Sequence, residues 1–204
     1  MPKGAERKMY ELETARLGLR KFTMADLEAH SAIYSNPEVT QFLPGGPFLD
    51  PETAQDASSW VVRYFIRHWQ LYDFGAWALV DKETEKLVGH GGLKFLPRSP
   101  TSPPPSLIEA PQEIDIFYLL DRPYWGKGLA TEVGRAFLAY GFKKLSLDYI
   151  AAITRPENTA SQHVLEKLGM VYAKEAYYYG VDVLYYAISR AAYDLRNLKN
   201  AGPP

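Results

Sequence analysis

The stretch from Ile114 to Val133 constrains the fold of this chain more than any other part of the sequence. It indicates an apolar strand over 114–120, a polar break, a turn in which Gly126 and Gly128 bracket Lys127, and then a segment with helical apolar spacing. A helix that begins at such a turn directs unpaired backbone N–H groups outward at the positive end of its dipole. Because glycine lets an anion approach the backbone closely, this arrangement predicts a phosphate-bearing ligand at the turn.

The composition narrows the class of protein that carries this stretch. The chain has 204 residues, of which 47% are hydrophobic and 14% aromatic, enough for the packed core of one domain. The formal net charge of −1 gives no broad basic surface for nucleic acid, and the absence of cysteine excludes disulfides, thiolate metal sites and a thiol nucleophile. The four histidines are scattered, so no metal is expected, and His90 and His163 are given no role.

No segment suggests export or membrane insertion. The first residues, MPKGAERKMYELET, have no apolar run like that of a signal peptide. A run of about 18 apolar residues, the length of a membrane span, occurs nowhere. We therefore expect a cytoplasmic protein that acts without a membrane or nucleic-acid partner.

The predicted elements alternate irregularly between strands and helices. Strands are expected at 16–22, 75–80, 86–96, 114–120, 147–154, 170–178 and 181–189, and helices at 24–35, 51–71, 129–141 and 156–168. Thr23 and Asp50 are expected to cap the first two helices, and Gly169 to end the fourth. This order is typical of an α+β or layered α/β fold rather than of a regular doubly wound sheet.

A single domain is expected over residues 14–190. Residues 1–13 are polar and of mixed charge, and we expect them to be flexible. Residues 191–204 are expected to form one short helical turn and a loose tail. The segment 97–111 carries six prolines, and because proline cannot donate to a sheet ladder, a loop or insertion is expected there.

Three interpretations compete for the glycine turn when it is taken alone. A P-loop requires a serine or threonine after Lys127 and a glycine further upstream, and neither is present. A dinucleotide fingerprint requires a third glycine where Thr131 stands, and Asp148 is weak support for its acidic partner. The third interpretation is a tight strand-to-helix turn without a ligand. Lys127 itself fits a phosphate contact and a solvated lysine about equally well.

Four segments that follow one another along the chain resemble the GNAT N-acetyltransferase superfamily. They are TARLGLR from Thr14, IDIFYLL from Ile114, YWGKGLATE from Tyr124, and PENTAS from Pro156 together with EKLGM from Glu166. Within the third, Trp125 to Ala130 resembles the acetyl-CoA signature [QR]-x-x-G-x-[GA], with Trp125 in place of the usual Gln or Arg. The chain as a whole looks like the ribosomal-protein-alanine N-acetyltransferase-like branch.

The resemblance implies a GNAT fold. This is an α+β (α/β layered) architecture with a mixed central sheet of about seven strands, splayed at the fourth and fifth strands and flanked by about four helices. It also implies acetyl-CoA as the co-substrate, with no metal.

By the same resemblance, the glycine turn and the strand before it bind coenzyme A. The pyrophosphate is expected on backbone N–H groups and the pantetheine arm along the splayed strand. The expected contacts are Tyr118, Leu119, Leu120, Trp125, Gly126, Lys127, Gly128, Leu129, Ala130, Thr131, Asn158 and Ser161. Taken alone, Asn158 fits a helix N-cap, whereas the resemblance favours a contact of Asn158 and Ser161 with the pantetheine and the thioester.

Acyl transfer to an amine needs a group that accepts a proton, since a lysine-like amine has a pKa of about 10.4 and an α-amine of about 8. Asp115 is the first candidate because it stands where this branch usually has glutamate. Glu113 lies two residues earlier on the same strand face and is the second. A solvated strand end is the ordinary alternative, and it fits Glu113 better than Asp115. Asn158 and Ser161 complete the predicted catalytic set.

The acid that would protonate the leaving thiolate is missing from its usual place. Many members of the superfamily carry a tyrosine seven residues after the asparagine, and here that position is Leu165. The candidates to replace it are Ser161, Tyr118, Tyr177, Tyr178 and Tyr179, although tyrosines in strands more often pack.

The resemblance therefore predicts an N-acetyltransferase that moves an acetyl group from acetyl-CoA to a primary amine by direct attack on the thioester. The amine would belong to a peptide, such as a protein N-terminus, or to a small molecule. One alternative is a catalytically weak acyl-CoA-binding module that acts as a sensor or scaffold. A nucleotide-binding protein is a more remote alternative. The protein is expected to be a monomer or a homodimer.

Overall fold

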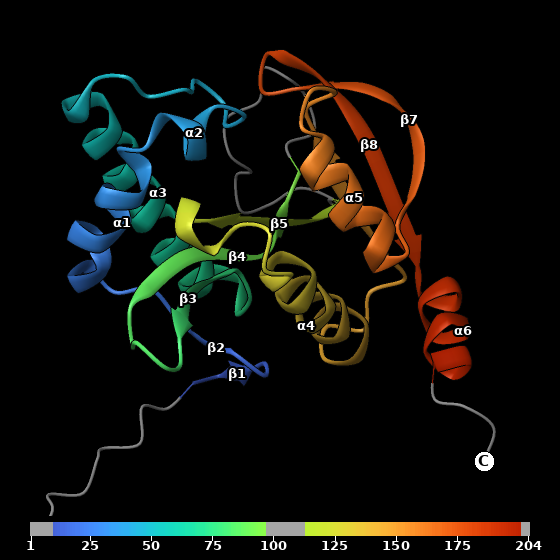
Figure 1. The fold of residues 1–204 in the computed structure, drawn as a ribbon. Coiled ribbons are helices and arrows are strands. Elements are labelled where there is room, and N and C mark those ends of the chain that lie inside the picture. The colour runs from blue at the N-terminus through green and yellow to red at the C-terminus, as the bar shows by residue number, and fades with distance from the viewer. Residues whose placement is uncertain (1–9, 97–112, 201–204) are drawn as a thin grey trace, which may run out of the picture.

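The fold is one mixed β-sheet with helices on both faces (Figure 1). The computed structural model describes residues 10–96 and 113–200, so the predicted proline-rich loop 97–111 lies outside the described residues. The described residues form six α-helices, two short 3-10 helices and eight strands, in the sheet order β1-β2-β3-β4-β5-β6-β8-β7. The strands are β1 Leu12–Glu13, β2 Leu17–Arg20, β3 Ala76–Asp81, β4 Leu87–Phe95, β5 Ile114–Leu120, β6 Tyr149–Thr154, β7 Val171–Tyr178 and β8 Val181–Ser189. The helices are η1 Met24–Asp26, α1 Leu27–Tyr34, α2 Pro37–Thr40, α3 Pro51–Tyr72, η2 Arg122–Tyr124, α4 Leu129–Lys143, α5 Thr159–Leu168 and α6 Arg190–Asn200.

The predicted α+β arrangement is confirmed, and the expected helix boundaries form for the expected reasons. Thr23 and Asp26 make a capping box at the first helix. The Asp50 carboxylate accepts the Thr53 N–H at 2.8 Å and caps α3. Gly169 follows α5 in a left-handed conformation with φ of 87°, as a glycine at that position should.

Near each end of the chain, the described residues are more regular than the sequence suggests. Leu12 and Glu13 form a strand that pairs with β2, so the flexible segment expected over 1–13 does not reach residue 12. The expected tail beyond residue 190 begins instead with the eleven-residue helix α6. Its buried anchor is Tyr193, whose ring centroid lies 4.7 Å from that of Phe142 in α4. Among the described side chains of this helix Tyr193 alone is buried, whereas Leu195 and Leu198 are exposed, so its apolar residues do not mark a buried face in the sequence.

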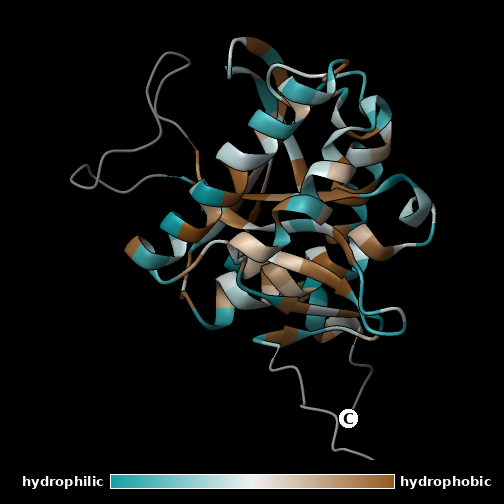
Figure 2. Ribbon diagram, turned by 90° about the vertical axis from the view of Figure 1, so that its left-hand side faces the viewer, coloured by the Kyte–Doolittle hydropathy of each residue, from teal (hydrophilic) through white to brown (hydrophobic). Residues whose placement is uncertain are grey.

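Side chains of β5 alternate between two layers of the molecule. The even-numbered positions Ile114, Ile116 and Leu120 are buried in the main core, which α4 covers. The odd-numbered positions face the opposite layer, where Phe117 packs near α3 and Leu119 near α1. Figure 2 shows the resulting pattern, with hydrophobic residues concentrated in the central strands and hydrophilic residues on the outer helices and loops. Because α4 and α3 cover opposite faces of the sheet, the even-numbered and odd-numbered side chains of β5 contact different groups of residues.

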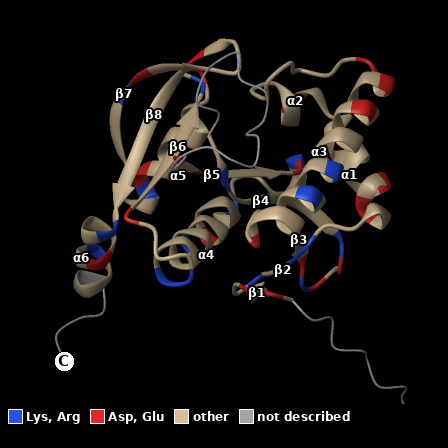
Figure 3. Ribbon diagram, turned by 180° about the vertical axis from the view of Figure 1, so that it is seen from behind, with Lys and Arg blue, Asp and Glu red and all other residues tan. Residues whose placement is uncertain are grey.

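Charged residues of both signs lie mainly on the helices and loops, and few lie on the central strands (Figure 3). Within the described part of the chain, no helix combines the length and the apolar character needed to cross a bilayer.

Candidate active site

The turn between β5 and α4 leaves the start of α4 without a side-chain cap. Gly126 and Gly128 both adopt left-handed backbone conformations, with φ of 71° and 76°, which glycine takes without strain. Gly128 is the N-cap residue, and the Glu132 N–H donates to its carbonyl at 3.0 Å as the first helical hydrogen bond. The helix therefore presents unpaired N–H groups to an anion or to water, those of Leu129, Ala130 and Thr131.

Side chains beside the turn fasten it to its surroundings. The Trp125 indole N–H donates to the Leu120 carbonyl at 2.6 Å, and the Arg122 guanidinium lies 4.9 Å from the centroid of the same indole. Trp125 thus holds the turn against the end of β5. The Lys127 ammonium lies 5.4 Å from the centroid of the Tyr124 ring, on an exposed part of the turn.

Strands β5 and β6 run parallel but separate almost at once. They share a single pair in register, Asp115 with Ala151, whereas β5 pairs with β4 along its whole length. This separation is the predicted splay, at the fourth and fifth of the strands expected from the sequence. Over the residues that the structure describes, no strand pairs with the second half of β5 on the β6 side.

Two hydrogen bonds show which backbone groups of β5 face the splay. The Leu96 N–H donates to the Glu113 carbonyl, and the Asp121 N–H donates to β4 at 2.8 Å. Odd-numbered residues therefore bond to β4. In an antiparallel pair the bonding direction alternates, so Tyr118 and Leu120 direct their backbone groups toward β6.

The start of α5 and the side chain of Tyr118 meet on the α4 side of the sheet. The Tyr118 hydroxyl lies 3.1 Å from the Ser161 hydroxyl and 3.3 Å from the Ser161 carbonyl. The Asn158 side-chain carbonyl accepts the Ser161 N–H at 3.1 Å, so Asn158 caps α5 here. Burial raises the pKa of the Tyr118 hydroxyl, which keeps the phenol protonated at neutral pH. Leu165 is only 1% exposed and belongs to the core.

Asp115 lies on the opposite side of the sheet and is only 2% exposed. Its Oδ2 lies 2.9 Å from the Lys94 ammonium, which also donates to the Tyr179 hydroxyl at 2.9 Å. Burial raises the pKa of the Asp115 carboxyl, and Lys94 offsets part of that shift. Burial alone would lower the pKa of Lys94, but Asp115 and Tyr179 outweigh it and the pKa is raised, so Lys94 stays protonated. Among the described residues, Asp115 Oδ1 makes no hydrogen bond of good geometry, although the nearby Ile153 backbone N–H also lowers the pKa of the carboxyl.

Glu113, the second predicted base, lies at the start of β5 in a half-buried position. Burial, and after it the Glu113 carboxylate, raises the pKa of the hydroxyls of Tyr149 and Tyr185. Glu113 therefore faces tyrosines of β6 and β8, while Asp115 faces Lys94.

His30 and His90 lie apart from these groups, in the layer under α1 and α3, whereas His163 lies in α5. His90 is buried in β4, with its Nδ1 at 2.9 Å from Nε2 of His30, and His30 Nδ1 lies 2.8 Å from the Ser58 hydroxyl. Over residues 10–96 and 113–200, no group of three or more His, Cys, Asp or Glu side chains is placed to hold a metal ion.

Comparison with known proteins identifies the family. A family model described as an acetyltransferase (GNAT) domain matches residues 16–171. The chain belongs to this family. An uncharacterized N-acetyltransferase, p20, from Bacillus licheniformis is 30% identical over 160 residues, which cover 78% of this chain and 82% of the relative.

Solved acetyltransferase structures share the fold. A GNAT-family acetyltransferase from Bacillus anthracis is 27% identical with a TM-score of 0.67, over 88% of this chain and 98% of that one. The ribosomal-protein-S5-alanine acetyltransferase from Vibrio fischeri is 21% identical with a TM-score of 0.63, over 88% of this chain and 96% of that one. At 21% identity the second likeness shows the fold alone. The predicted GNAT fold is thus confirmed, with β1 as an eighth strand and with more helices than expected.

Family membership makes acetyl-CoA-dependent acetylation the chemistry to be explained. The structure brings most of the residues singled out from the sequence around the splay, with Tyr118, Asn158 and Ser161 on one face of the sheet and Asp115 on the other. Lys94 is the site residue that the sequence analysis missed. Its position within a glycine-rich strand gives no sign of a partner, because the contact with Asp115 depends on the register of β4 against β5.

Proposed function

We propose that this acetyltransferase moves the acetyl group of acetyl-CoA to a primary amine by direct attack on the thioester. The observation that carries the proposal is the arrangement about the splay. The buried Asp115 carboxylate lies on one face of β5, the protonated Tyr118 hydroxyl lies on the other, and backbone groups open toward β6 between them.

The residues around the turn fit the cofactor in charge and shape. The uncapped N–H groups at the start of α4, with those of Gly126 to Gly128, would bind the pyrophosphate. The backbone groups of Tyr118 and the Leu120 N–H would pair with the amide-rich pantetheine arm, as a neighbouring strand would, while the Leu120 carbonyl accepts the Trp125 indole N–H. Asn158 and Ser161 would line the thioester end. When bound, acetyl-CoA supplies an activated acyl group.

Asp115 would accept the amine proton, directly or through water. An amine that is protonated at neutral pH must lose a proton to become a nucleophile, and the raised pKa of Asp115 makes it a stronger base than a solvated aspartate. In the transfer, the amine nitrogen bonds to the acyl carbon and the carbon–sulfur bond breaks. Asp115 takes one proton from the ammonium before the attack. The second proton, released from the nitrogen as the amide forms, passes to the departing thiolate, which leaves as the thiol.

Tyr118 would stabilise the leaving sulfur with a hydrogen bond. A phenol whose pKa is raised is a weaker acid than an ordinary thiol of about 8.5, so it favours hydrogen bonding to the thiolate over full proton transfer. Ser161 would orient the Tyr118 hydroxyl across their 3.1 Å contact. This pair would fill the role that Leu165 leaves open.

The acceptor would approach from the α3 face, because α4 and the turn occupy the other face. It would be the primary amine of a peptide or of a small molecule. The Tyr179 hydroxyl and the Lys94–Asp115 pair are among the polar groups that it would meet there.

The assay measures thiol release from acetyl-CoA with a thiol-reactive dye and a panel of peptide and small amines. The background is low because the protein contains no cysteine. We expect turnover by the natural chain and a loss of about 100-fold or more in kcat for Asp115→Asn. Asp26→Asn is the matched control. Asp26 is also a buried, ion-paired carboxylate, but its partner is Arg20 of β2, and neither residue belongs to β5 or β6. Equal activity of Asp115→Asn and the natural chain would refute the role of Asp115.

A second candidate function is a catalytically weak acyl-CoA-binding module that acts as a sensor or scaffold. The observation that favours it is the Lys94–Asp115 ion pair, which already neutralises the proposed base. Acetyl-CoA binding measured by calorimetry, without transfer to any amine of the panel, would support this candidate over the enzyme.

A further inference from the structure

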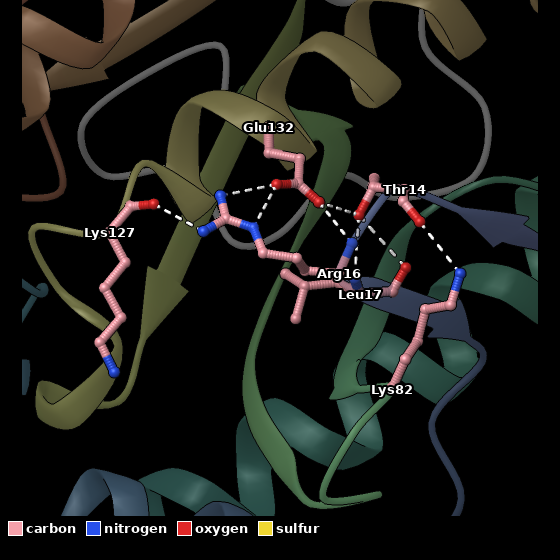
Figure 4. Close-up of polar contacts among 6 residues, drawn as sticks. All are labelled: Thr14, Arg16, Leu17, Lys82, Lys127 and Glu132. Atoms are coloured by element: carbon pink, nitrogen blue, oxygen red, sulfur yellow. Dashed lines mark hydrogen bonds and ion pairs between the residues drawn. The ribbon is translucent and has the colours of Figure 1, made fainter.

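The first motif of the chain contacts the glycine turn from across the fold. Arg16, just before β2, places its guanidinium between α4 and the turn (Figure 4). Its Nε and Nη2 lie 2.8 and 2.7 Å from Glu132 Oε2, and its Nη1 donates to the Lys127 carbonyl at 2.9 Å. The Arg16 guanidinium therefore links the Glu132 side chain of α4 to the backbone of the turn.

The position of Arg16 is itself fixed by Glu132. The Arg16 backbone N–H donates to Glu132 Oε1 at 2.9 Å, and the Thr14 hydroxyl donates to the same oxygen at 2.6 Å. Burial would raise the pKa of the Glu132 carboxyl, but the hydrogen bonds from Thr14 and Arg16 outweigh it, and the pKa is lowered. Glu132 is thus an anion at neutral pH that holds Arg16 by both its backbone and its side chain.

The bond to the Lys127 carbonyl sets the direction of the next N–H group. In a trans peptide the C=O and the following N–H point in opposite directions. When Arg16 binds the Lys127 carbonyl, the Gly128 N–H is therefore directed away from Arg16. Both glycines of the turn have left-handed conformations and few neighbours, so without this contact the peptide has little to hold its orientation.

We infer that Arg16 is a positioning residue for cofactor binding, which acts through the Lys127 carbonyl and is held in place by Glu132 and Thr14. The inference rests on the proposed function, in which this turn binds the pyrophosphate of coenzyme A. Arg16 acts here by geometry, because all three of its guanidinium nitrogens already contact Glu132 or Lys127.

A substitution of Glu132 distinguishes positioning by Arg16 from a simple effect of charge on CoA binding. A carboxylate in the first turn of α4 repels a pyrophosphate, so on charge alone Glu132→Gln would tighten the binding of CoA. If Glu132 holds Arg16 in position, the same substitution weakens binding instead. Arg16→Lys keeps the positive charge but loses the fork that reaches two partners, and it also weakens binding.

The test measures the dissociation constant of CoA by calorimetry for the natural chain, Glu132→Gln and Arg16→Lys. We expect each variant to raise the constant about tenfold, with the KM for acetyl-CoA rising in parallel and kcat little changed. Arg20→Lys is the matched control: Arg20 lies at the other end of β2 and forms a forked pair with Asp26, with bonds of 2.8 and 2.6 Å. Its constant is expected to stay within about twofold of the natural chain.

Two binding results would overturn the inference. Tighter or unchanged CoA binding by Glu132→Gln shows that charge outweighs positioning. Equal weakening by Arg20→Lys shows a general effect of losing a forked ion pair. If Arg16→Lys fails to fold in a thermal melt, the nearly isosteric Glu132→Gln still decides the matter. If the natural chain binds no CoA, the proposed function fails together with the inference, whereas normal binding with unaffected variants removes the inference alone.

Discussion

Replacing Lys94 with methionine should reveal how much the buried ion pair under the splay contributes to stability. Lys94→Met removes the ammonium at 2.9 Å from Asp115 and leaves a carboxylate that is 2% exposed without a counter-charge. Removing one partner of a buried pair costs about 3–5 kcal/mol. For a chain of this size, each kcal/mol shifts Tm by about 2–4 °C, so Tm should fall by about 6–20 °C.

The effect of Asp115→Asn should change sign with the background. In the natural chain it removes the partner of Lys94 and destabilises the fold. In the Lys94→Met background it removes an unpaired buried charge and should restore about 2 kcal/mol. Urea unfolding followed by the fluorescence of the four tryptophans measures all four chains. The reasoning fails if Asp115→Asn destabilises both backgrounds by the same amount.

The Lys94→Met variant should also depend on pH in an unusual direction. Burial already raises the pKa of Asp115, and the loss of Lys94 removes the charge that opposes this shift. A carboxyl with a folded pKa above its unfolded value of about 3.9 contributes stability below that value, and this contribution is lost as pH rises through the folded pKa. Relative to the natural chain, Lys94→Met should therefore gain stability as pH falls from neutral toward the unfolded pKa of about 3.9. Adding Asp115→Asn to the Lys94→Met variant should abolish this dependence of stability on pH.

Three further substitutions test other parts of the fold and the site. Tyr118→Phe removes the hydroxyl beside Ser161 and should lower kcat about tenfold or more in the thiol-release assay, with CoA affinity by calorimetry little changed. A loss confined to KM would contradict the role of the hydroxyl. Gly91→Ala should destabilise the sheet by about 1–3 kcal/mol in urea, since the new Cβ would lie 2.8 Å from a backbone oxygen of β5 and 2.8 Å from an aromatic ring of α4. A smaller loss would mean that β4 and β5 separate easily. Tyr193→Ala should cost about 3–5 kcal/mol in the same assay if α6 is an integral part of the core, and almost nothing if it is a tail.

The sequence predicts those parts of the molecule whose cause is local. The strand over 114–120, the glycine turn and α4 appear where apolar spacing and glycine chemistry place them. Asp50 and Gly169 mark helix boundaries because their capping bonds involve only nearby residues.

What the sequence does not predict depends on contacts between distant segments. The Lys94–Asp115 pair requires the exact register of two strands separated by a proline-rich segment. The hydrogen bond from Arg16 to the Lys127 carbonyl joins residues 111 positions apart. Because it is made to a backbone atom, no residue type at the turn indicates it. Helix α6 is missed because the burial of Tyr193, its one buried side chain among those described, depends on packing against Phe142. Asn158 shows the reverse case, since its capping bond is local and the sequence alone indicates it.

Because the side chains of β5 alternate between two layers, substitutions along this strand should have two different kinds of effect. The sheet acts as a partition, with the turn and α4 on one side and the Lys94–Asp115 pair on the other. A scan of single substitutions along this one strand is therefore expected to divide by parity. Even-numbered positions such as Tyr118 should change kinetics toward the thioester, and odd-numbered positions such as Phe117 should change the choice of amine. A seven-residue strand would then hold two independent sets of specificity positions, interleaved one residue apart.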